Sequence, residues 1–414
     1  MTTAEFLRRH TIDTGPLQHP AYRRMFIGSA ASSFGLQFTA VAVPVQMYAL
    51  TRSSLWVGLI GLAGLVPLLL FALWGGAVAD VVDRRRLLLA ASGLMWATTL
   101  GLLAQALLRV GSPVLLLALV GVQASAFAVG SPTRQAIVPR LVPAEQVAAA
   151  NTLSSTMFNA TIVAGPLAAG LVLLHFDVAA AYAVDAATFA VVLWATVRLP
   201  PIPPRTVAAG PPGWREVRAG LSYIWTSPVL LLSFAIDIAA MVLALPRSLF
   251  PEMAAERFGA GSVGWLYAAI GMGSVVAGLT SGWIGRVRRQ GVALVAAVVA
   301  WGLAVAVAGL AHSLWQAVFF LAVGGAADLI SAVYRQTILQ TYAPDQLQGR
   351  MQGIFIAVVA GGPRLGDLRA GATAAVVGPT VAWVGGGVAS AVVALVLAIG
   401  FPALLRYAPT RANR

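Results

Sequence analysis

The chain of 414 residues is 59% hydrophobic and only 10% charged, with a mean hydropathy of +0.84. Soluble domains carry about 25% charged residues, so a water-exposed surface could not be covered and a soluble globular protein is excluded. Cysteine is absent and four histidines are scattered, which excludes disulfide frameworks and thiol chemistry and leaves no expected metal site or cofactor.

Apolar stretches without charged residues recur along the chain, and about 20 such residues are enough to cross a bilayer. Cutting these stretches at Gly/Pro or charged turns predicts an all-α membrane protein with twelve transmembrane helices. The expected spans are 24–50, 54–79, 87–109, 113–137, 147–174, 178–197, 229–250, 261–284, 291–311, 314–339, 350–376 and 380–405. The first span is too long for a signal-peptide core, so we expect it to remain uncleaved.

The net charge of +13 is carried by arginine, because lysine is absent. With both termini on one side of the membrane, the loops on that side hold most of the arginines, such as Arg84–Arg86. The opposite loops hold little more than Arg52, Arg109 and Arg257. By the positive-inside rule, this asymmetry predicts a multi-pass protein of the cell (inner or plasma) membrane with both termini cytoplasmic. It explains the basic charge through contact with the lipid bilayer, without nucleic acid.

The longest polar interruption lies at Leu199–Ser227 and contains PPIPPR (200–205) and GPPG (210–213). Prolines at this density forbid a continuous helix and are typical of a linker. We therefore expect an N-terminal six-helix half at 1–198, a cytoplasmic linker at 199–227 and a C-terminal six-helix half at 228–414.

The two halves repeat each other. Arg134-Gln135 returns as Arg335-Gln336, an offset of 335 − 134 = 201 residues. Duplicated halves with a solute site between them are typical of secondary transporters. A Gly-Pro pair also lies inside the fifth and the eleventh expected spans, and we expect a helix kink at each because proline removes a backbone hydrogen bond. These pairs are Gly165, Pro166, Gly362 and Pro363.

The loop between the second and third spans reads Gly76-Ala-Val-Ala-Asp80-Val-Val-Asp83-Arg84-Arg85-Arg86. It is similar to the signature loop of the major facilitator superfamily, with Asp83 where that family usually has glycine. The resemblance implies the twelve-helix major facilitator fold in two pseudo-symmetric halves. We interpret Gly76, Asp80, Arg84 and Arg85 as a gating loop, in which Asp80 holds a neighbouring helix N-terminus through the helix dipole. Alternatively, the arginines only anchor topology and contact anionic lipid.

Further motifs resemble the enterobactin (siderophore) exporter branch of drug:proton antiporters. They are Arg134-Gln-Ala-Ile-Val-Pro139, Leu245-Pro246-Arg247-Ser-Leu-Phe250-Pro251 and Gly361-Gly-Pro-Arg364-Leu-Gly-Asp367. The resemblance covers nearly the whole chain and implies export of a siderophore or an amphipathic drug-like small molecule.

Intramembrane charges are the candidates for substrate binding or proton coupling, because each is costly to insert. Asp237 and Asp328 fall near the midplane of the seventh and tenth spans, and Arg335 lies two helical turns from Asp328. Proton coupling requires such a carboxylate to change its protonation between two environments. The residue types alone also allow a purely structural role for each of these charges.

Three more charges belong to this set. Arg247 sits near the outer end of the seventh span, where it could contact an anionic group. Arg364 and Asp367 are three residues apart on the eleventh span, close enough to pair. A mutually satisfied structural pair is the alternative interpretation. For Asp185, on a sixth span that we expect to be peripheral, a structural role is favoured.

A chain without lysine cannot form the phosphate-binding loop GxxxxGK[ST], so an ion or solute gradient must drive transport. The sequence therefore predicts a monomeric secondary exporter, not an enzyme, that works by alternating access with protons and a small-molecule substrate. A multidrug or macrolide efflux pump is the alternative within this class. A membrane sensor or scaffold that transports nothing is the alternative from another class.

Overall fold

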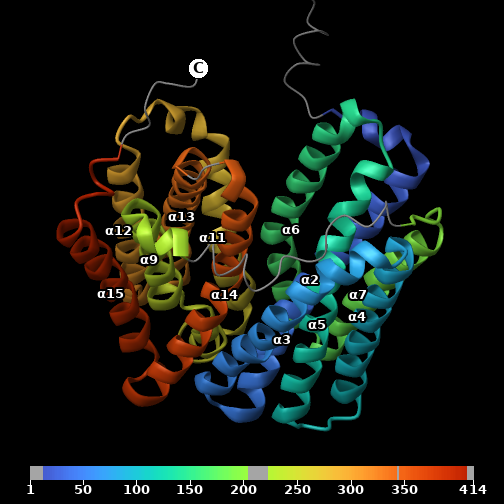
Figure 1. Cartoon of the computed structure of the whole chain (residues 1–414). Helices are drawn as coiled ribbons and strands as arrows, with labels where there is room; N and C mark the ends of the chain where they lie inside the picture. The colour runs from blue at the N-terminus through green and yellow to red at the C-terminus, as the bar shows by residue number, and fades with distance from the viewer. Residues whose placement is uncertain (1–12, 204–221, 343–344, 408–414) are drawn as a thin grey trace, which may run out of the picture. The chain divides into compact units, whose positions relative to one another are not determined.

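The computed structural model describes residues 13–203, 222–342 and 345–407, and within them all side chains except those of 72–81, 345–350, 352, 353 and 356 (Figure 1). None of these residues lies in a β-strand. Eleven helical segments are long and apolar enough to cross a membrane. The twelfth expected span is α14 (Asp345–Val377), which is 33 residues long but carries Arg364, Asp367 and Arg369. The all-α membrane fold predicted from the sequence is confirmed.

The chain forms two compact units. The first unit comprises Met1–Gln46 and Val66–Pro211, and the second comprises Met47–Leu65 and Pro212–Arg414. The long helices that begin in the N-terminal part of the chain are α2 (Pro20–Thr51), α3 (Ser54–Val81), α4 (Arg84–Leu107), α5 (Pro113–Ile137), α6 (Val147–His175) and α7 (Val178–Val197). The boundary between the units falls within α2 and α3, so the turn between these helices packs with the second unit.

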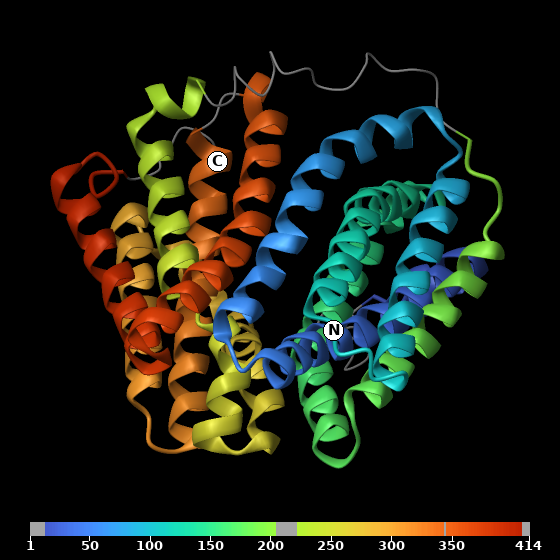
Figure 2. The same cartoon turned by 90° about the horizontal axis from the view of Figure 1, so that it is seen from below.

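The remaining long helices belong to the second unit. They are α9 (Pro228–Ala239), α11 (Val263–Leu279), α12 (Gln290–Leu310), α13 (Leu314–Tyr342), α14 and α15 (Pro379–Gly400). Within this unit α12 packs against both α13 and α15, as the orange and red helices show in Figure 2. Gly378 separates α14 from α15 with a positive φ of 84°, a conformation that favours glycine, and Pro379 then starts α15.

Local sequence explains where several helices begin. Ser112 precedes Pro113 at the start of α5, and its Oγ accepts the backbone N–H of Leu115 at 3.3 Å. Asp177 caps α7 by accepting the N–H of Ala180 at 3.0 Å. Short polar side chains at this position satisfy N–H groups that have no partner inside the helix. The observed bounds of α5 and α7 are those expected from the sequence.

The seventh span is the clear departure from expectation, because it is not one helix over 229–250. The α-helix α9 ends at Ala239 and is followed by a π-helical segment, η4 (Ala240–Ala244), and by Leu245 in an extended conformation. Pro246 explains the break, because a proline lacks an N–H group and disfavours the helical conformation of the residue before it. The chain resumes as η5 (Arg247–Leu249) and α10 (Phe250–Met253).

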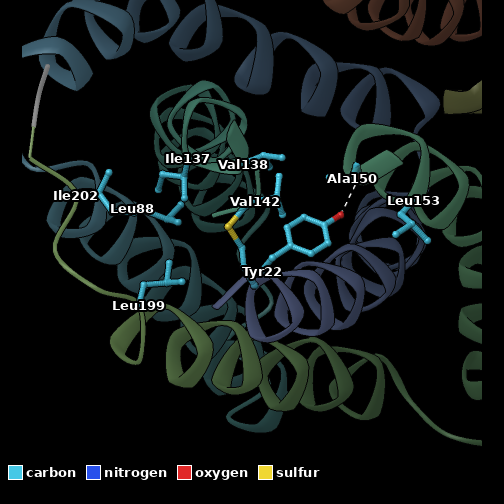
Figure 3. Close-up of a cluster of buried hydrophobic side chains, with 10 residues drawn as sticks. Tyr22, Leu88, Ile137, Val138, Val142, Ala150, Leu153, Leu199 and Ile202 are labelled. Carbon is cyan, nitrogen blue, oxygen red and sulfur yellow. Dashed lines mark hydrogen bonds between the residues drawn. The ribbon is translucent and has the colours of Figure 1, made fainter. Parts of the chain in front are cut away.

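One hydrophobic cluster closes an end of the first unit (Figure 3). Its buried members come from α2, α4, α5, α6, the connection between α5 and α6, and the segment after α7: Tyr22, Met25, Leu88, Ile137, Val138, Val142, Ala150, Leu153, Leu199 and Ile202. Tyr22 also donates its hydroxyl to the carbonyl oxygen of Ala150 at 2.8 Å. The cluster therefore fixes four helices and the beginning of the expected linker to one another.

Candidate functional site

The strongest electrostatic contact in the second unit is an ion pair between Asp237 on α9 and Arg335 on α13. The Asp237 side chain is 1% exposed and the Arg335 side chain 6%. An unpaired charge at this depth would be severely destabilising, so each partner accounts for the presence of the other. The sequence placed Arg335 on the same face as Asp328, but its ion-pair partner comes from a different helix.

Asp328 lies half-buried on α13. Its backbone carbonyl accepts the hydroxyl of Ser331 at 3.0 Å, an interaction that leaves the carboxylate uninvolved. Among the described residues the carboxylate makes no ion pair. Asp237 and Asp328, which the sequence treated as equivalent candidates, therefore stand in different electrostatic environments.

Arg247 stands at the break of the seventh span, directly after Pro246, and its side chain is exposed. Its guanidinium carbon lies 5.8 Å from the centre of the Tyr267 ring on α11, a cation–π geometry. The Tyr267 hydroxyl donates to the carbonyl oxygen of Arg247 at 3.2 Å. Tyr267 thus holds both the backbone and the side chain of Arg247.

Arg364 and Asp367 lie close together on α14 but do not form an ion pair within 4 Å among the described side chains. Arg364 donates from Nη1 to the carbonyl oxygen of Ala360, at 2.7 Å on its own helix. Oδ1 of Asp367 is buried and has no hydrogen-bond partner in the described part of the chain. α14 packs against η5, the segment that begins with Arg247, so Arg247 lies on an element in contact with the helix of Arg364 and Asp367. These three residues form a cluster with one more positive than negative charge.

Arg369, which the sequence analysis did not select, stabilises the broken span. Its Nε donates to the carbonyl oxygen of Val242 at 3.0 Å, its Nη1 donates to that of Ala382 at 3.2 Å, and its Nη2 donates to that of Leu243. A planar guanidinium suits this arrangement, since its donors point in fixed directions. The break at Pro246 in the sequence signals that carbonyls nearby need external donors, but not which arginine supplies them.

In the predicted gating loop, side chains are described only from Val82 onward. The roles predicted for Gly76 and Asp80 therefore lie outside the described side chains. Arg84 donates from Nη1 to the carbonyl oxygen of Ala136 at 3.3 Å. Arg85 donates from Nη2 to that of Val197 at 2.6 Å. Both arginines therefore hold neighbouring helix ends of the first unit.

Asp83 lies in this loop and was not selected as a functional residue from the sequence. Its Oδ1 accepts the N–H groups of Arg85 at 2.9 Å and Arg86 at 3.1 Å, which caps α4. Its Oδ2 accepts the N–H of Ile202 at 3.1 Å, and the N–H of Arg84 donates back to the Ile202 carbonyl at 3.1 Å. An aspartate directly before a helix is a recognisable capping signal, whereas the contact with Ile202 is a tertiary one.

Both Gly-Pro pairs lie inside continuous helices, α6 and α14. The bends expected at Pro166 and Pro363 stay predictions. In each case the glycine permits close packing, because a Cβ on Gly165 would lie 2.5 Å from Cβ of Gln37. A Cβ on Gly362 would lie 2.9 Å from Cβ of Met241.

The segment Met47–Leu65 packs with the second unit through polar and glycine contacts. The Tyr48 hydroxyl donates to Oε1 of Glu256 at 2.6 Å, and the Ser54 hydroxyl donates to Oε2 of Glu252. Gly58 and Gly61 face the backbone of α14, where an added Cβ would lie 2.6 Å from the Asp367 carbonyl oxygen and 2.5 Å from that of Arg364. Close glycine contacts of this kind are typical of helix packing in membranes.

Comparison with known proteins agrees with this architecture. The family model described as "transmembrane secretion effector" matches residues 12–407. The enterobactin exporter EntS of Shigella boydii is 30% identical over 407 residues, with 95% of this chain and 94% of the relative covered. EntS of Citrobacter koseri is 31% identical over 404 residues, with 94% of each chain covered.

Solved transporters share the fold. The nucleoside transporter NupG matches with a TM-score of 0.73 at 14% identity and covers 94% of this chain and 99% of its own. A peptide transporter POT bound to sulfate matches with a TM-score of 0.71 at 14% identity, with 94% and 96% covered. At this level of identity the likeness concerns the fold alone.

Proposed function

Because the chain belongs to the transmembrane secretion effector family of major facilitator exporters, we propose that it exports an anionic small molecule in exchange for protons. The coarser function, a multi-pass membrane exporter with a small-molecule substrate, follows from the family and from the similarity to exporters. The proton, the class of substrate and the monomeric state are our proposals.

The observation that carries proton coupling is the buried ion pair of Asp237 and Arg335. Arginine stays protonated in proteins, so the carboxylate is the only member of the pair that can change its charge. Proton uptake by Asp237 cancels the attraction that holds α9 to α13. The pair therefore supports a mechanism in which protonation favours rearrangement of these two helices, with residues 1–198 and 228–414 as the halves that alternate. Asp328 is the second candidate.

The substrate class is argued from the cluster of Arg247, Arg364 and Asp367. Its excess positive charge favours a negatively charged group, and the exposed guanidinium of Arg247 stands beside the aromatic ring of Tyr267. An anionic molecule that carries an aromatic ring would match both features. Siderophores of the kind named for the relatives fit this description, and amphipathic drugs remain the alternative substrates.

Transport by the purified protein in lipid vesicles tests proton coupling. An imposed pH gradient should drive uphill transport by the wild type. The double variant Asp237→Asn with Arg335→Gln, which leaves no uncompensated buried charge, should lose this response while downhill exchange persists. Glu145→Gln, which alters an exposed carboxylate outside the long helices, is the matched control. Wild-type transport that ignores the pH gradient would contradict proton antiport. Preferential loss of anionic over neutral substrates in Arg247→Gln would support the substrate class.

We further propose that both termini are cytoplasmic, as the distribution of arginines predicts. A reporter fused at Arg414 should respond as a cytoplasmic protein, and one inserted within 254–261 as an external one. The reverse result would overturn the proposed orientation.

A further inference from the structure

A second buried aspartate lies in the first unit, far along the chain from the ion pair already described. Asp185 on α7 is 0% exposed. Its Oδ2 accepts the hydroxyl of Thr39 on α2 at 2.5 Å and that of Thr99 on α4 at 3.4 Å. Gln123 on α5 donates to the Thr99 hydroxyl at 3.2 Å and extends the same network. Two other helices, α2 and α4, thus direct hydroxyl groups toward this carboxyl group, and α5 adds a polar contact behind Thr99.

The other oxygen of this carboxyl group, Oδ1, has no hydrogen-bond partner among the described residues. Gly35 on α2 lies against it, since a Cβ added there would stand 2.8 Å from Oδ1. The nearby Thr188 hydroxyl donates at 2.8 Å to the backbone carbonyl of Asp185 and is therefore occupied. Thr39 is the closer donor to Oδ2, and the Thr99 hydroxyl also lies 3.1 Å from the Met95 carbonyl oxygen.

Among the described residues, no cation lies in an ion pair with Asp185. The hydrogen-bond donors that its carboxyl group meets in the described part of the chain are the hydroxyls of Thr39 and Thr99. Tyr182 lies one turn earlier on α7 and donates its hydroxyl to Gln46. The charged or titratable side chains of the surrounding helices lie toward the helix ends in the sequence: Tyr22, Arg23, Arg24 and Tyr48 on α2, Arg84, Arg85 and Arg86 on α4, Arg134 on α5 and His175 on α6.

A buried carboxylate without a cation loses its hydration and gains little in return, whereas the neutral acid avoids this penalty. One oxygen that accepts a hydrogen bond and one without a donor fit a carboxylic acid whose hydrogen lies on the second oxygen. Asp237 is different, because Arg335 stabilises its ionised form. The two buried aspartates therefore favour opposite protonation states in the same structure.

We propose that Asp185 is a proton-binding site of the first unit: it holds a proton in this conformation and releases it when α2, α4 and α7 rearrange during transport. As a link to transport, this inference rests on the proposed proton exchange, but proton binding by Asp185 is measurable without it. The hydroxyls of Thr39 and Thr99 stabilise the carboxylate that remains after release.

A neighbouring set of polar residues supplies an internal control. Gln46 and Gln105 exchange hydrogen bonds through their side-chain amides at 3.1 and 3.0 Å. Tyr182 donates its hydroxyl to Oε1 of Gln46 at 2.7 Å. This set joins the same helices α2, α4 and α7, yet every amide oxygen has a donor and no member carries a charge. Tyr182→Phe therefore perturbs the same interface without removing a partner of Asp185.

Infrared difference spectroscopy of the purified protein in lipid, recorded while the pH is raised, tests proton binding directly. The wild type should lose a carbonyl band of a protonated carboxylic acid. Asp185→Asn should lack this band, whereas Tyr182→Phe and Glu145→Gln should retain it. An unchanged band in Asp185→Asn would overturn the proposal, as would the absence of any band that Asp185→Asn removes.

Thr39→Val provides a second variant that keeps the acid and the volume of the side chain. Its band should remain but change frequency, and its midpoint should move to higher pH because the ionised form has lost its shortest hydrogen bond. A band identical to the wild type in both respects would overturn the proposal, and this variant decides the question even if Asp185→Asn fails to fold.

Transport separates this inference from the proposed function. In vesicles, Asp185→Asn should lose pH-driven transport and keep downhill exchange. If transport by the wild type does not depend on the pH gradient, the proposal of proton antiport is wrong. Proton binding by Asp185 is then still tested by the infrared band. If the wild type is driven by the gradient and Asp185→Asn is driven equally, the transport role of Asp185 is wrong.

Discussion

Each of the two units contains an aspartate that is almost completely buried, and the two aspartates are stabilised in different ways. In the second unit Asp237 is 1% exposed and has Arg335 as its counter-ion. In the first unit Asp185 is 0% exposed and meets only hydroxyl donors. The comparison teaches that burial alone does not define the role of an intramembrane carboxylate. Its partner decides whether the charged or the neutral form is stabilised, and therefore which way its protonation can change.

A similar contrast holds for helix continuity. The first helix of the N-terminal half, α2, continues through Pro44 over 32 residues, whereas the seventh span breaks at Pro246 and recruits Arg369. Trp301 on α12 also donates to the π-helical segment, from Nε1 to the carbonyl oxygen of Ala240 at 3.4 Å. The second unit thus uses fixed donors to support irregular backbone, which is tolerated at membrane depth only when its polar groups are satisfied.

The largest effect is expected from breaking the ion pair by removing one partner. Arg335→Ala leaves Asp237 as an uncompensated buried charge, which costs about 3–5 kcal/mol of unfolding free energy. Chemical unfolding of the purified protein measures this loss. The double variant Asp237→Asn with Arg335→Gln removes both charges and should recover most of it. Asp185→Asn replaces one neutral group by another and should cost much less. Equal losses from Arg335→Ala and Asp185→Asn would erase the contrast between the two units.

A smaller effect is expected at the broken span. Arg369→Lys keeps the positive charge but cannot reproduce a planar fork, so at least one of the carbonyls of Val242, Leu243 and Ala382 loses its donor. An unsatisfied buried polar group costs about 1–3 kcal/mol. The thermal unfolding temperature of Arg369→Lys should fall accordingly. The unfolding free energy of Arg23→Lys, at an exposed position, should stay within about 0.5 kcal/mol of the wild type. An Arg369→Lys variant as stable as Arg23→Lys would show that charge alone supports the break.

The smallest effects are expected at the Gly-Pro pairs. Gly165→Ala places a methyl group against Cβ and Cγ of Gln37, atoms close to the backbone that cannot move far. Overpacking of this kind costs about 1–3 kcal/mol. Gly362→Ala should cost less, because its nearest contact is at a longer distance from the flexible Met241.

Gly93→Ala on α4 is the matched control, since no atom lies within 4 Å of the added Cβ. It should gain about 0.5–1 kcal/mol through helix propensity. Chemical unfolding of the three variants gives their unfolding free energies. A larger decrease in Gly362→Ala than in Gly165→Ala would contradict the assigned packing.

Most of the fold could be predicted from the sequence, because the membrane requires long apolar helices that composition reveals. The spans 113–137 and 178–197 agree with the helices at both ends. The seventh span was predicted as one helix although Pro246 was in view, because hydropathy does not register a change of backbone conformation. The sequence also gave no means to find the partner of Arg335, since spacing along α13 favours Asp328 whereas tertiary packing supplies Asp237. The same limit applies to Asp185, whose distinctive feature is the absence of a cation around it.

The clamp formed by Asp83 has a mechanical consequence. Oδ2 of Asp83 and the backbone of Arg84 grip Ile202 from both sides, while the side chains of Leu199 and Ile202 lie in the hydrophobic cluster at the end of the first unit. A pull transmitted along the chain from beyond Pro203 therefore reaches the start of α4 before it reaches the last turn of α7. Tension on the connecting segment would be borne by two hydrogen bonds and the buried side chain of Ile202, and it would act on the loop that precedes α4.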